Sequence, residues 1–459
     1  MKKNKINYPK IMKNSNKIFF VVSLLLAVML ISFGITNAQS YSLQQAQDFA
    51  VKNSINSANA KLDVDLARAK KNEVTGIGLP QISGSFDVKD YVEIPTSLVP
   101  AEFFGGPPGS FAAVQFGTKY NATAGISASQ LIFSSDYLVG LQASKTYMEL
   151  AQKAESRTKI ETMTSVAKAY YSALVAKERF KLLEANITRL EKMLSDMIVM
   201  NKSGFIEKID VDRVEVNYNN LLVEKEKTQR LINLSEALLK FQMGLDVSQN
   251  ILLSDSLGTF LNNLTEINNA KANPSARIEY SLLESQNKLN ALDLKRYKMS
   301  YLPSLVAYGS AVAQAQRQEF NIFDTQLRWF PIGVIGATLN VPIFDGLQKN
   351  YKVEQAKINL LKSKNGLDQL QKSINLETNN ASTSYTNSLA TLKLQKKNID
   401  LAESVYQTTK IKYDQGVGSN LEVITAQASY REALVNYYAA IYDALVNKTD
   451  LDKALGNIK

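Results

Sequence analysis

The chain contains no cysteine and no histidine among its 459 residues. Zinc sites built on these side chains, nucleophilic catalysis by either of them, and disulfide bonds are therefore excluded. Carboxylate chemistry and sites for Mg²⁺ or Ca²⁺ remain open, because these ions take oxygen ligands. No acid–base constellation stands out from the scattered carboxylates. The sequence thus favours a protein that is not an enzyme and that carries no metal or other cofactor.

Long apolar runs are absent after the first 38 residues. Within those residues, six lysines precede an apolar run from Ile18 to Ile35, and Thr36-Asn37-Ala38 offers a small-residue cleavage site. This order is typical of a secretory signal peptide (1–38), with an uncleaved membrane anchor as the alternative. No later stretch approaches 18 continuous apolar residues, so no further transmembrane helix is expected. Any part of the mature chain that enters a membrane must do so with β-strands.

The net charge of +10 belongs in part to this N-terminal segment. Its six lysines are not balanced by any acidic residue, so the rest of the chain carries only +4. A charge this small on so long a chain does not indicate a nucleic-acid partner.

An internal duplication organises the rest of the chain. Four residues of the first half recur 212 positions later with the same or a similar side chain: Gly204, Asp210, Val211 and Gly244 correspond to Gly416, Glu422, Val423 and Gly456. Each half predicts a helix, a pair of strands, a very long helix, a glycine turn and a second helix. The predicted repeats are 39–274, with a connector over 243–274, and 275–459.

The longest predicted helices show heptad-like spacing of apolar and small residues. We expect helices over 134–203, 206–242, 345–415 and 420–455. Seam positions include Tyr170 in the first of these and Tyr406 in the third. Residues 134–203 contain no proline, and at 1.5 Å per residue such a helix reaches roughly 100 Å. No compact core is that long, so these helices are expected to belong to an extended assembly.

Four segments alternate between apolar and polar residues and predict strands: 81–92, 117–133, 304–318 and 331–344. Loops over 93–116 and 319–330 join them in pairs. Alternation over about ten residues is typical of membrane strands, although the signal of each segment is weak. Four strands cannot cross a bilayer alone, because their open edges would leave backbone groups unpaired in hydrocarbon. The chain is therefore expected to form oligomers.

Two other readings remain open at this point. A periplasm-spanning coiled coil or surface fibre without a pore would account for the helices and the signal, but not for strand pairs at matching positions. A secreted enzyme is the second alternative.

The chain resembles the TolC-like outer-membrane efflux proteins over about residues 41–457. The resemblance is carried by Ser42-Leu43-Gln44-Gln45-Ala46, by Leu-Pro before the first and third strands, by Val341-Pro342-Ile343-Phe344-Asp345-Gly346, and by Leu421-Glu422-Val423-Ile424. It implies a mainly α-helical protein with membrane β-strands: a homotrimer whose single 12-stranded β-barrel continues into a long α-helical periplasmic barrel.

The resemblance also implies a function and a location. It implies an exit duct in the outer membrane of a Gram-negative bacterium, reaching into the periplasm and passing small molecules or polypeptides. The implied partners are outer-membrane lipid, a periplasmic adaptor (a membrane fusion protein) and an inner-membrane RND or ABC pump.

Several residues match functional positions of these relatives. At the two helix–turn–helix tips, Gly204, Phe205, Gly416 and Val417 are implied to contact the adaptor; the glycines also supply the positive φ of a helix end. Asp210 and Glu422 are implied to line the closed end of the tunnel, with Tyr413 in a latch. The positions of the usual charged partners hold Gly418 and Thr425.

Simpler roles are also open for some of these side chains. Ser419-x-x-Glu422 predicts a capping box, and Asp210 favours a helix N-terminus. Both roles are compatible with a gate.

The remaining candidate functional residues lie at the ends of the predicted strands. Tyr120, Trp329 and Phe330 flank strands and predict either an aromatic girdle at the membrane interface or a packed loop. Pro342 and Phe344 mark the expected strand-to-helix junction, because proline suits a strand end.

Overall fold

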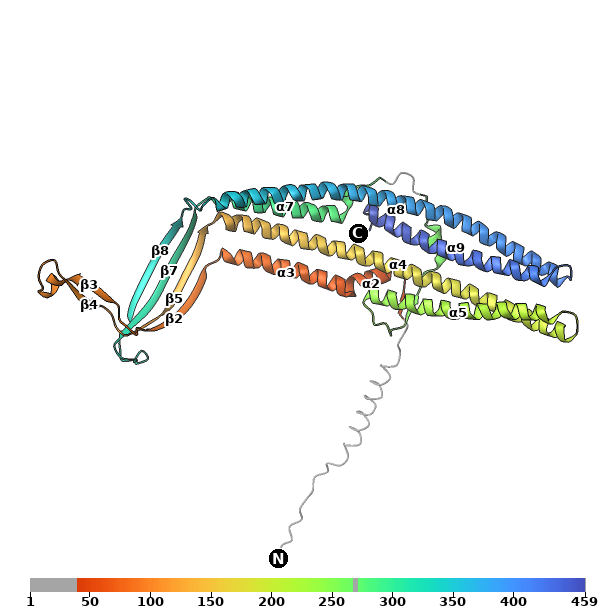
Figure 1. The fold of residues 1–459 in the computed structure, drawn as a ribbon, viewed down its shortest axis with the longest axis horizontal. Coiled ribbons are helices and arrows are strands. Elements are labelled where there is room, and N and C mark those ends of the chain that lie inside the picture. The colour runs from red at the N-terminus through yellow and green to blue at the C-terminus, as the bar shows by residue number, and fades with distance from the viewer. Residues whose placement is uncertain (1–38, 267–270, 459) are drawn as a thin grey trace, which may run out of the picture. The chain divides into compact units, whose positions relative to one another are not determined.

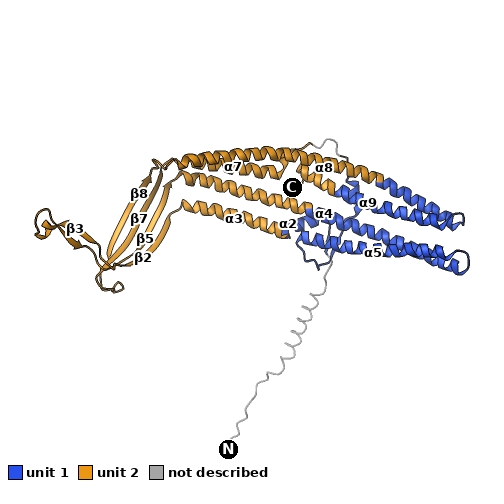
Figure 2. Cartoon of the chain, viewed as in Figure 1, with its two compact units in different colours: residues 1–53, 165–264, 395–445 blue, residues 54–164, 265–394, 446–459 orange. Residues whose placement is uncertain are grey.

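The computed structural model describes residues 39–266 and 271–458, so the predicted signal peptide lies outside the described residues. The chain divides into two compact units (Figure 2). Unit 1 comprises residues 1–53, 165–264 and 395–445, and unit 2 comprises residues 54–164, 265–394 and 446–459. Each unit takes segments from both predicted repeats, so the division at residue 274 stays a prediction.

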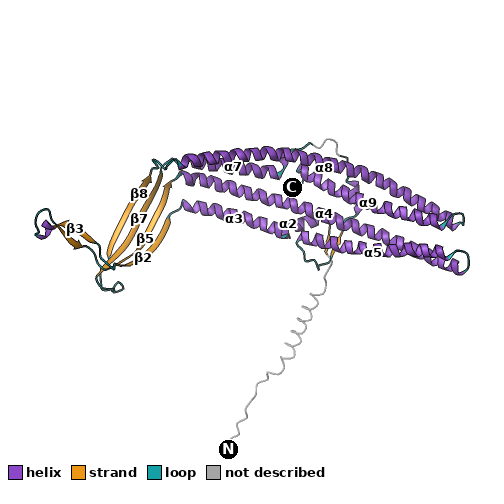
Figure 3. Ribbon diagram, viewed as in Figure 1, coloured by secondary structure: helices purple, strands orange, loops and turns teal. Residues whose placement is uncertain are grey.

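Helices dominate the described chain, as the sequence predicted (Figure 3). The four longest begin and end within a few residues of their predicted limits: α4 (Ser135–Lys202), α5 (Lys208–Met243), α8 (Gln348–Asp414) and α9 (Asn420–Leu455). Shorter elements are α2 (Leu43–Asn53), α3 (Ile55–Ile77), α6 (Leu257–Asn262), α7 (Ile278–Met299) and the 3₁₀ turn η2 (Pro274–Ala276). Over residues 39–266 and 271–458, none of the helices combines the length and the apolar character needed to cross a bilayer.

The core of unit 1 is the seam between its helices. Leu190 and Met197 of α4 pack with Val214 and Leu221 of α5 in one buried cluster. The predicted seam residue Tyr170 is fully buried, and its hydroxyl donates to Asp255 Oδ2 at 3.0 Å. The same oxygen accepts from the Leu43 backbone N–H at 2.7 Å, which fixes the start of α2 beside α4. Nearby, β1 (Gln39–Tyr41) pairs in parallel with β6 (Ile251–Leu253).

Unit 2 contains an antiparallel sheet of four strands in the order β2-β5-β7-β8 (Figure 1). The strands are β2 (Gln81–Asp90), β5 (Tyr120–Phe133), β7 (Ser304–Arg317) and β8 (Phe330–Asn340). All four coincide with the predicted segments, although β8 ends four residues earlier than expected. Strands β2 and β8 form the two open edges of the sheet.

The strand register gives this sheet two faces of different polarity. One face is almost entirely apolar and carries Ile82, Phe86, Val88, Tyr120, Ala122, Ala124, Ile126, Ala311, Ala313, Ala315, Ile335, Ala337 and Leu339. The opposite face is polar on its first two strands and at one end of β7, with Ser83, Ser85, Asp87, Lys89, Asn121, Thr123, Ser127, Gln314 and Gln316. All residues of β2 are exposed, and so are nearly all of β8. The sheet therefore shows an apolar and a largely polar surface at once.

Strand β7 and the start of β8 differ from the first two strands in their alternation. The large side chains of β7, Val306, Tyr308 and Val312, lie on the second, largely polar face, and its small ones lie on the apolar face. Phe330, Ile332 and Val334 of β8 also lie on the largely polar face. The alternation within a strand shows which of its residues share a side. Only the pairing between strands shows which of these sides form the same face of the sheet.

The predicted loop over 93–116 is wrong in part, because it contains a two-stranded antiparallel hairpin. Its strands are β3 (Thr96–Pro100) and β4 (Phe111–Gln115), and the 3₁₀ turn η1 (Ala101–Phe104) follows β3. Strands of five residues between prolines and glycines leave too short a pattern to be recognised in the sequence.

Candidate functional site

The two helix–turn–helix tips have the same local structure. Gly204 follows α4 with φ 76°, and Gly416 follows α8 with φ 76°. At each tip the next residue closes the helix, because Phe205 N–H donates to Met200 O at 2.9 Å and Val417 N–H donates to Lys412 O at 3.0 Å. Only glycine adopts this left-handed conformation without strain, which explains the recurrence seen in the sequence.

Both turns present an apolar side chain to solvent. Phe205 is 78% exposed and Val417 is 76% exposed. Isolated apolar residues are common on surfaces. Here, however, the exposed pair occupies equivalent positions of the two turns.

We expect Gly416→Ala to destabilise the protein by about 1–2 kcal/mol, because a Cβ atom strains the left-handed conformation. Gly140→Ala is the matched control: Gly140 lies within helix α4, and the nearest atom to an added Cβ is 4.0 Å away. That control should be neutral or slightly stabilising, since alanine favours helices. Thermal unfolding followed by circular dichroism compares the two variants. An equal melting temperature for both would contradict the expected strain.

The structure joins the two tips through Asp210 and Asn420. Asn420, the first residue of α9, donates from its Nδ2 to the Asp210 backbone carbonyl at 3.0 Å and to Asp210 Oδ1 at 3.2 Å. Arg213 also approaches this carboxylate, with its Nη1 3.5 Å from Oδ1. Asp210 is thus tied to its own helix and to the second tip. The contact of Asn420 could not be predicted from the sequence, because a short polar residue at a helix start indicates only a local cap.

Tyr413 lies in the same region. Its hydroxyl is buried and, among the described residues, has no hydrogen-bond partner. Burial raises the pKa of this phenol, and the nearby carboxylates of Asp210 and Asp414 raise it further. A Cβ atom at Gly418 would lie 3.0 Å from the Tyr413 backbone nitrogen, so the turn has little room for a larger residue there. The Tyr413 hydroxyl thus lies within electrostatic reach of Asp210, the residue that Asn420 binds.

Glu422 is exposed in the first turn of α9. The hydroxyl of Ser419 accepts from the Leu421 N–H at 3.2 Å, one residue before the bond that a capping box would make. The Glu422 N–H donates instead to the Ser419 carbonyl at 3.1 Å. Together with Ala402, Val405 and Thr425, its side chain lines an open groove between α8 and α9.

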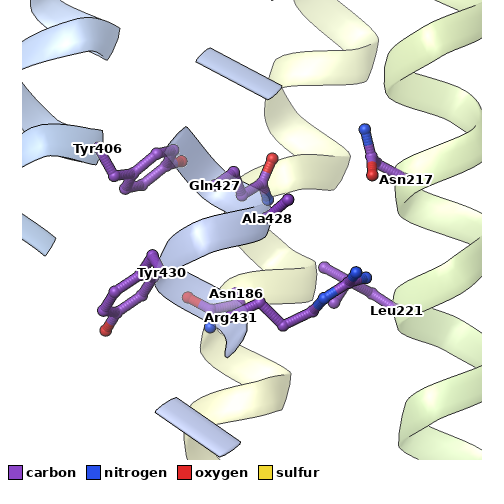
Figure 4. Close-up of a pocket in the computed structure, with 8 residues that line it drawn as sticks. All are labelled: Asn186, Asn217, Leu221, Tyr406, Gln427, Ala428, Tyr430 and Arg431. Carbon is purple, nitrogen blue, oxygen red and sulfur yellow. The ribbon is translucent and has the colours of Figure 1, made fainter. Parts of the chain in front are cut away.

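A small polar cavity lies farther along the same four helices (Figure 4). Its volume is about 20 Å³, which is room for one water molecule. Asn186, Asn217, Leu221, Tyr406, Gln427, Ala428, Tyr430 and Arg431 line it. The rings of Tyr406 and Tyr430 stack with centroids 6.1 Å apart. The two helical hairpins therefore meet here through polar groups, in contrast to the apolar seam between α4 and α5.

The aromatic residues predicted at the membrane interface separate into two groups. Tyr120 and Trp329 pack against a buried cluster of Ala122, Ala315 and Ile322. Phe330 pairs with Gln314 and lies on the opposite face of the sheet from Tyr120. Trp329 precedes β8, so strand alternation does not predict its packing against this cluster.

The predicted strand-to-helix junction lies between β8 and α8. Pro342 is half-buried, and Phe344 is 81% exposed. The Asp345 carboxylate accepts from the Lys349 N–H at 3.0 Å and so caps the start of α8. The chain thus leaves the sheet at proline and enters the helix at a cap.

The comparisons with known proteins agree with this architecture. The family described as Outer membrane efflux protein matches residues 297–457. The outer membrane protein TolC of Vibrio cholerae is 20% identical over 338 residues, covering 73% of this chain and 77% of that protein. The probable efflux pump outer membrane protein TtgC of Pseudomonas putida is 22% identical over 354 residues, covering 74% and 69% of the two chains.

Solved structures share the fold. The crystal structure of the open state of the Neisseria gonorrhoeae MtrE outer membrane channel superposes with a TM-score of 0.71 at 15% identity. The match covers 90% of this chain and 88% of that one. The likeness extends over nearly the whole of both chains, so this chain shares the fold of that channel.

Proposed function

Since the chain belongs to the outer membrane efflux protein family, we propose that it is the exit duct of a tripartite efflux or type I secretion system. It is a trimeric outer-membrane channel of a Gram-negative bacterium and not an enzyme. The proposed duct receives small molecules or polypeptides from a periplasmic adaptor and an inner-membrane pump of the RND or ABC type.

The observation that supports the duct most directly is the sheet with two exposed and unlike surfaces. In this proposal the face with Ile82, Phe86 and Ile126 contacts lipid, and the face with Ser83 and Thr123 lines the water-filled passage. The open edges β2 and β8 need partners, because unpaired N–H and C=O groups are costly in hydrocarbon. Three copies that pair edge to edge satisfy every strand.

The helix tips are the proposed docking point of the adaptor. Phe205 and Val417 offer two exposed apolar contacts at equivalent positions. The left-handed turns at Gly204 and Gly416 place these side chains beyond the ends of their helices. An apolar anchor on a fixed support is the arrangement that binding sites favour.

Asp210, Glu422 and Tyr413 are the proposed periplasmic gate. In a trimer, three copies of each carboxylate would surround the axis, narrow the passage and attract cations. The bond from Asn420 to Asp210 would hold the two tips of each protomer together, and Tyr413 would pack beneath them.

Positions in the membrane are also proposed for the residues at the two ends of the sheet. Tyr120 and Trp329 are proposed to lie near the outer membrane–water interface, where aromatic rings are favoured. Phe330 lies at the same end of the sheet, but on the face assigned to the passage. Pro342 and Phe344 are proposed to mark the periplasmic side, where the chain passes from sheet to helix.

Reconstitution of the purified chain tests the duct. We expect trimers by mass measurement in detergent and stable single-channel currents in planar bilayers. A monomer that stays in the aqueous phase, or a trimer that carries no current under any voltage or pH, would overturn the proposal.

A further inference from the structure

The hairpin β3–β4 exposes an unusual amount of apolar surface. Four of its large apolar side chains, and the residue that follows it, are between 60% and 80% exposed: Leu98, Phe103, Phe104, Phe111 and then Phe116. Residues 91–118 contain only two charged residues, Glu93 and Glu102, and no lysine or arginine. The Glu102 carboxylate is already engaged, because it accepts from the Gly109 N–H at 3.0 Å. Apolar patches of this kind mark interaction surfaces.

The hairpin lacks the means to be stable alone in water. It consists of five paired residues on each strand, and the described structure pairs its strands only with each other. Isolated two-stranded hairpins are marginal without a surface to pack on. A partner that covers the aromatic side chains would therefore stabilise it.

Lipid does not fit as that partner. Both edges of the hairpin are open, so insertion into hydrocarbon would leave backbone groups unpaired. Contact with anionic headgroups calls for lysine or arginine, and residues 91–118 provide neither. An uncharged apolar protein surface satisfies both constraints.

The chain topology brings such a surface close. The hairpin follows edge strand β2, at the end of the sheet remote from α3. The other edge strand, β8, begins at that same end, with Phe330 and Ile332 50% and 45% exposed on the face assigned to the passage. When the sheets of neighbouring protomers join β2 to β8, the hairpin of one copy reaches the start of β8 of the next.

We propose that the hairpin of residues 96–115 docks on a second copy of this chain, at the beginning of that copy's β8. Each of the three junctions of the trimer is then covered at its outer end by one hairpin. This inference rests on the proposed function, because it assumes sheets that join edge to edge.

Cysteine cross-linking tests the contact without background, because the chain contains no cysteine. We expect Leu98→Cys combined with Phe330→Cys to give covalent trimers with a short bismaleimide, since every junction holds one pair. Each single variant should remain uncross-linked. The matched control combines Leu98→Cys with Leu339→Cys, which is 62% exposed at the opposite end of β8 and should not react across protomers.

Each contrary result has a defined meaning. Failure of the Leu98–Phe330 pair in a preparation that still runs as a trimer on mild gels overturns the docking proposal and leaves the duct intact. Absence of the trimer itself contradicts the proposed function. Covalent dimers of Leu98→Cys alone would place hairpin against hairpin and overturn the β8 site.

A fluorescence experiment examines the membrane alternative. Phe103→Trp in a Trp329→Phe background leaves one reporter, because Trp329 is the single tryptophan of the chain. We expect no quenching by brominated phospholipids in reconstituted vesicles. Strong quenching would place the hairpin in the bilayer and overturn docking on a second copy.

Discussion

Bilayers that contain the Asp210→Ala, Glu422→Ala double variant are expected to carry a several-fold larger single-channel current than the unchanged protein. Removing both carboxylates widens the proposed constriction and abolishes its attraction for cations. The change also removes an acceptor of the Asn420 amide, so the tie between the tips weakens. Block by divalent cations added on the tip side should weaken in parallel. Unchanged current and unchanged cation block would refute the gate.

Asn420→Ala separates the two effects of the double variant on the current, which are the loss of carboxylate charge and the weaker tie between the tips. It removes the 3.0 and 3.2 Å bonds to Asp210 and leaves every carboxylate in place. We expect more frequent opening with cation block retained. Glu226→Ala is the matched control, because Glu226 is an exposed carboxylate of the same helix α5 that pairs with Arg230 at 3.1 Å. That variant should conduct like the unchanged protein.

Ile126→Arg is expected to prevent assembly in the outer membrane almost completely. Ile126 is 61% exposed on the apolar face of β5. An arginine facing lipid near the bilayer midplane costs about 2–4 kcal/mol, and a trimer would meet this cost three times. The amount of heat-resistant trimer in the outer-membrane fraction measures the effect.

Thr123→Arg is the control for this experiment. Thr123 lies three residues away on the same strand and faces the polar side. In the proposed duct the new arginine points into water, so assembly should be retained. The ion selectivity of the channel should shift towards anions. Equal loss of trimer in both variants would contradict the assignment of the two faces.

Much of this architecture could be predicted from local patterns. Heptad-like spacing without proline predicted the long helices, and α9 has the predicted limits of Asn420 and Leu455. The glycines at 204 and 416 predicted the turns, because a left-handed residue must follow each helix. Such features depend on neighbours within a few residues, and the residue order carries them directly.

The sheet has features that local patterns could not predict. Alternation located four strands, but it could not show that the large residues of β7 lie on the face opposite to Phe86. Nor could it find a hairpin whose two strands have only five residues each, between prolines and glycines. Each of these depends on which strand pairs with which, and in what register.

By itself, therefore, the sequence determined the long helices, their glycine turns, the four strands and the likeness between the two halves. Only the tertiary structure decided that the sheet has one apolar and one largely polar face, and that Asn420 binds Asp210 across 210 positions of the chain. The physical reason is the distance along the chain over which each feature is determined. Helix and strand periodicity arises from the backbone geometry of adjacent residues, whereas register and contacts between tips arise only when distant segments pack together.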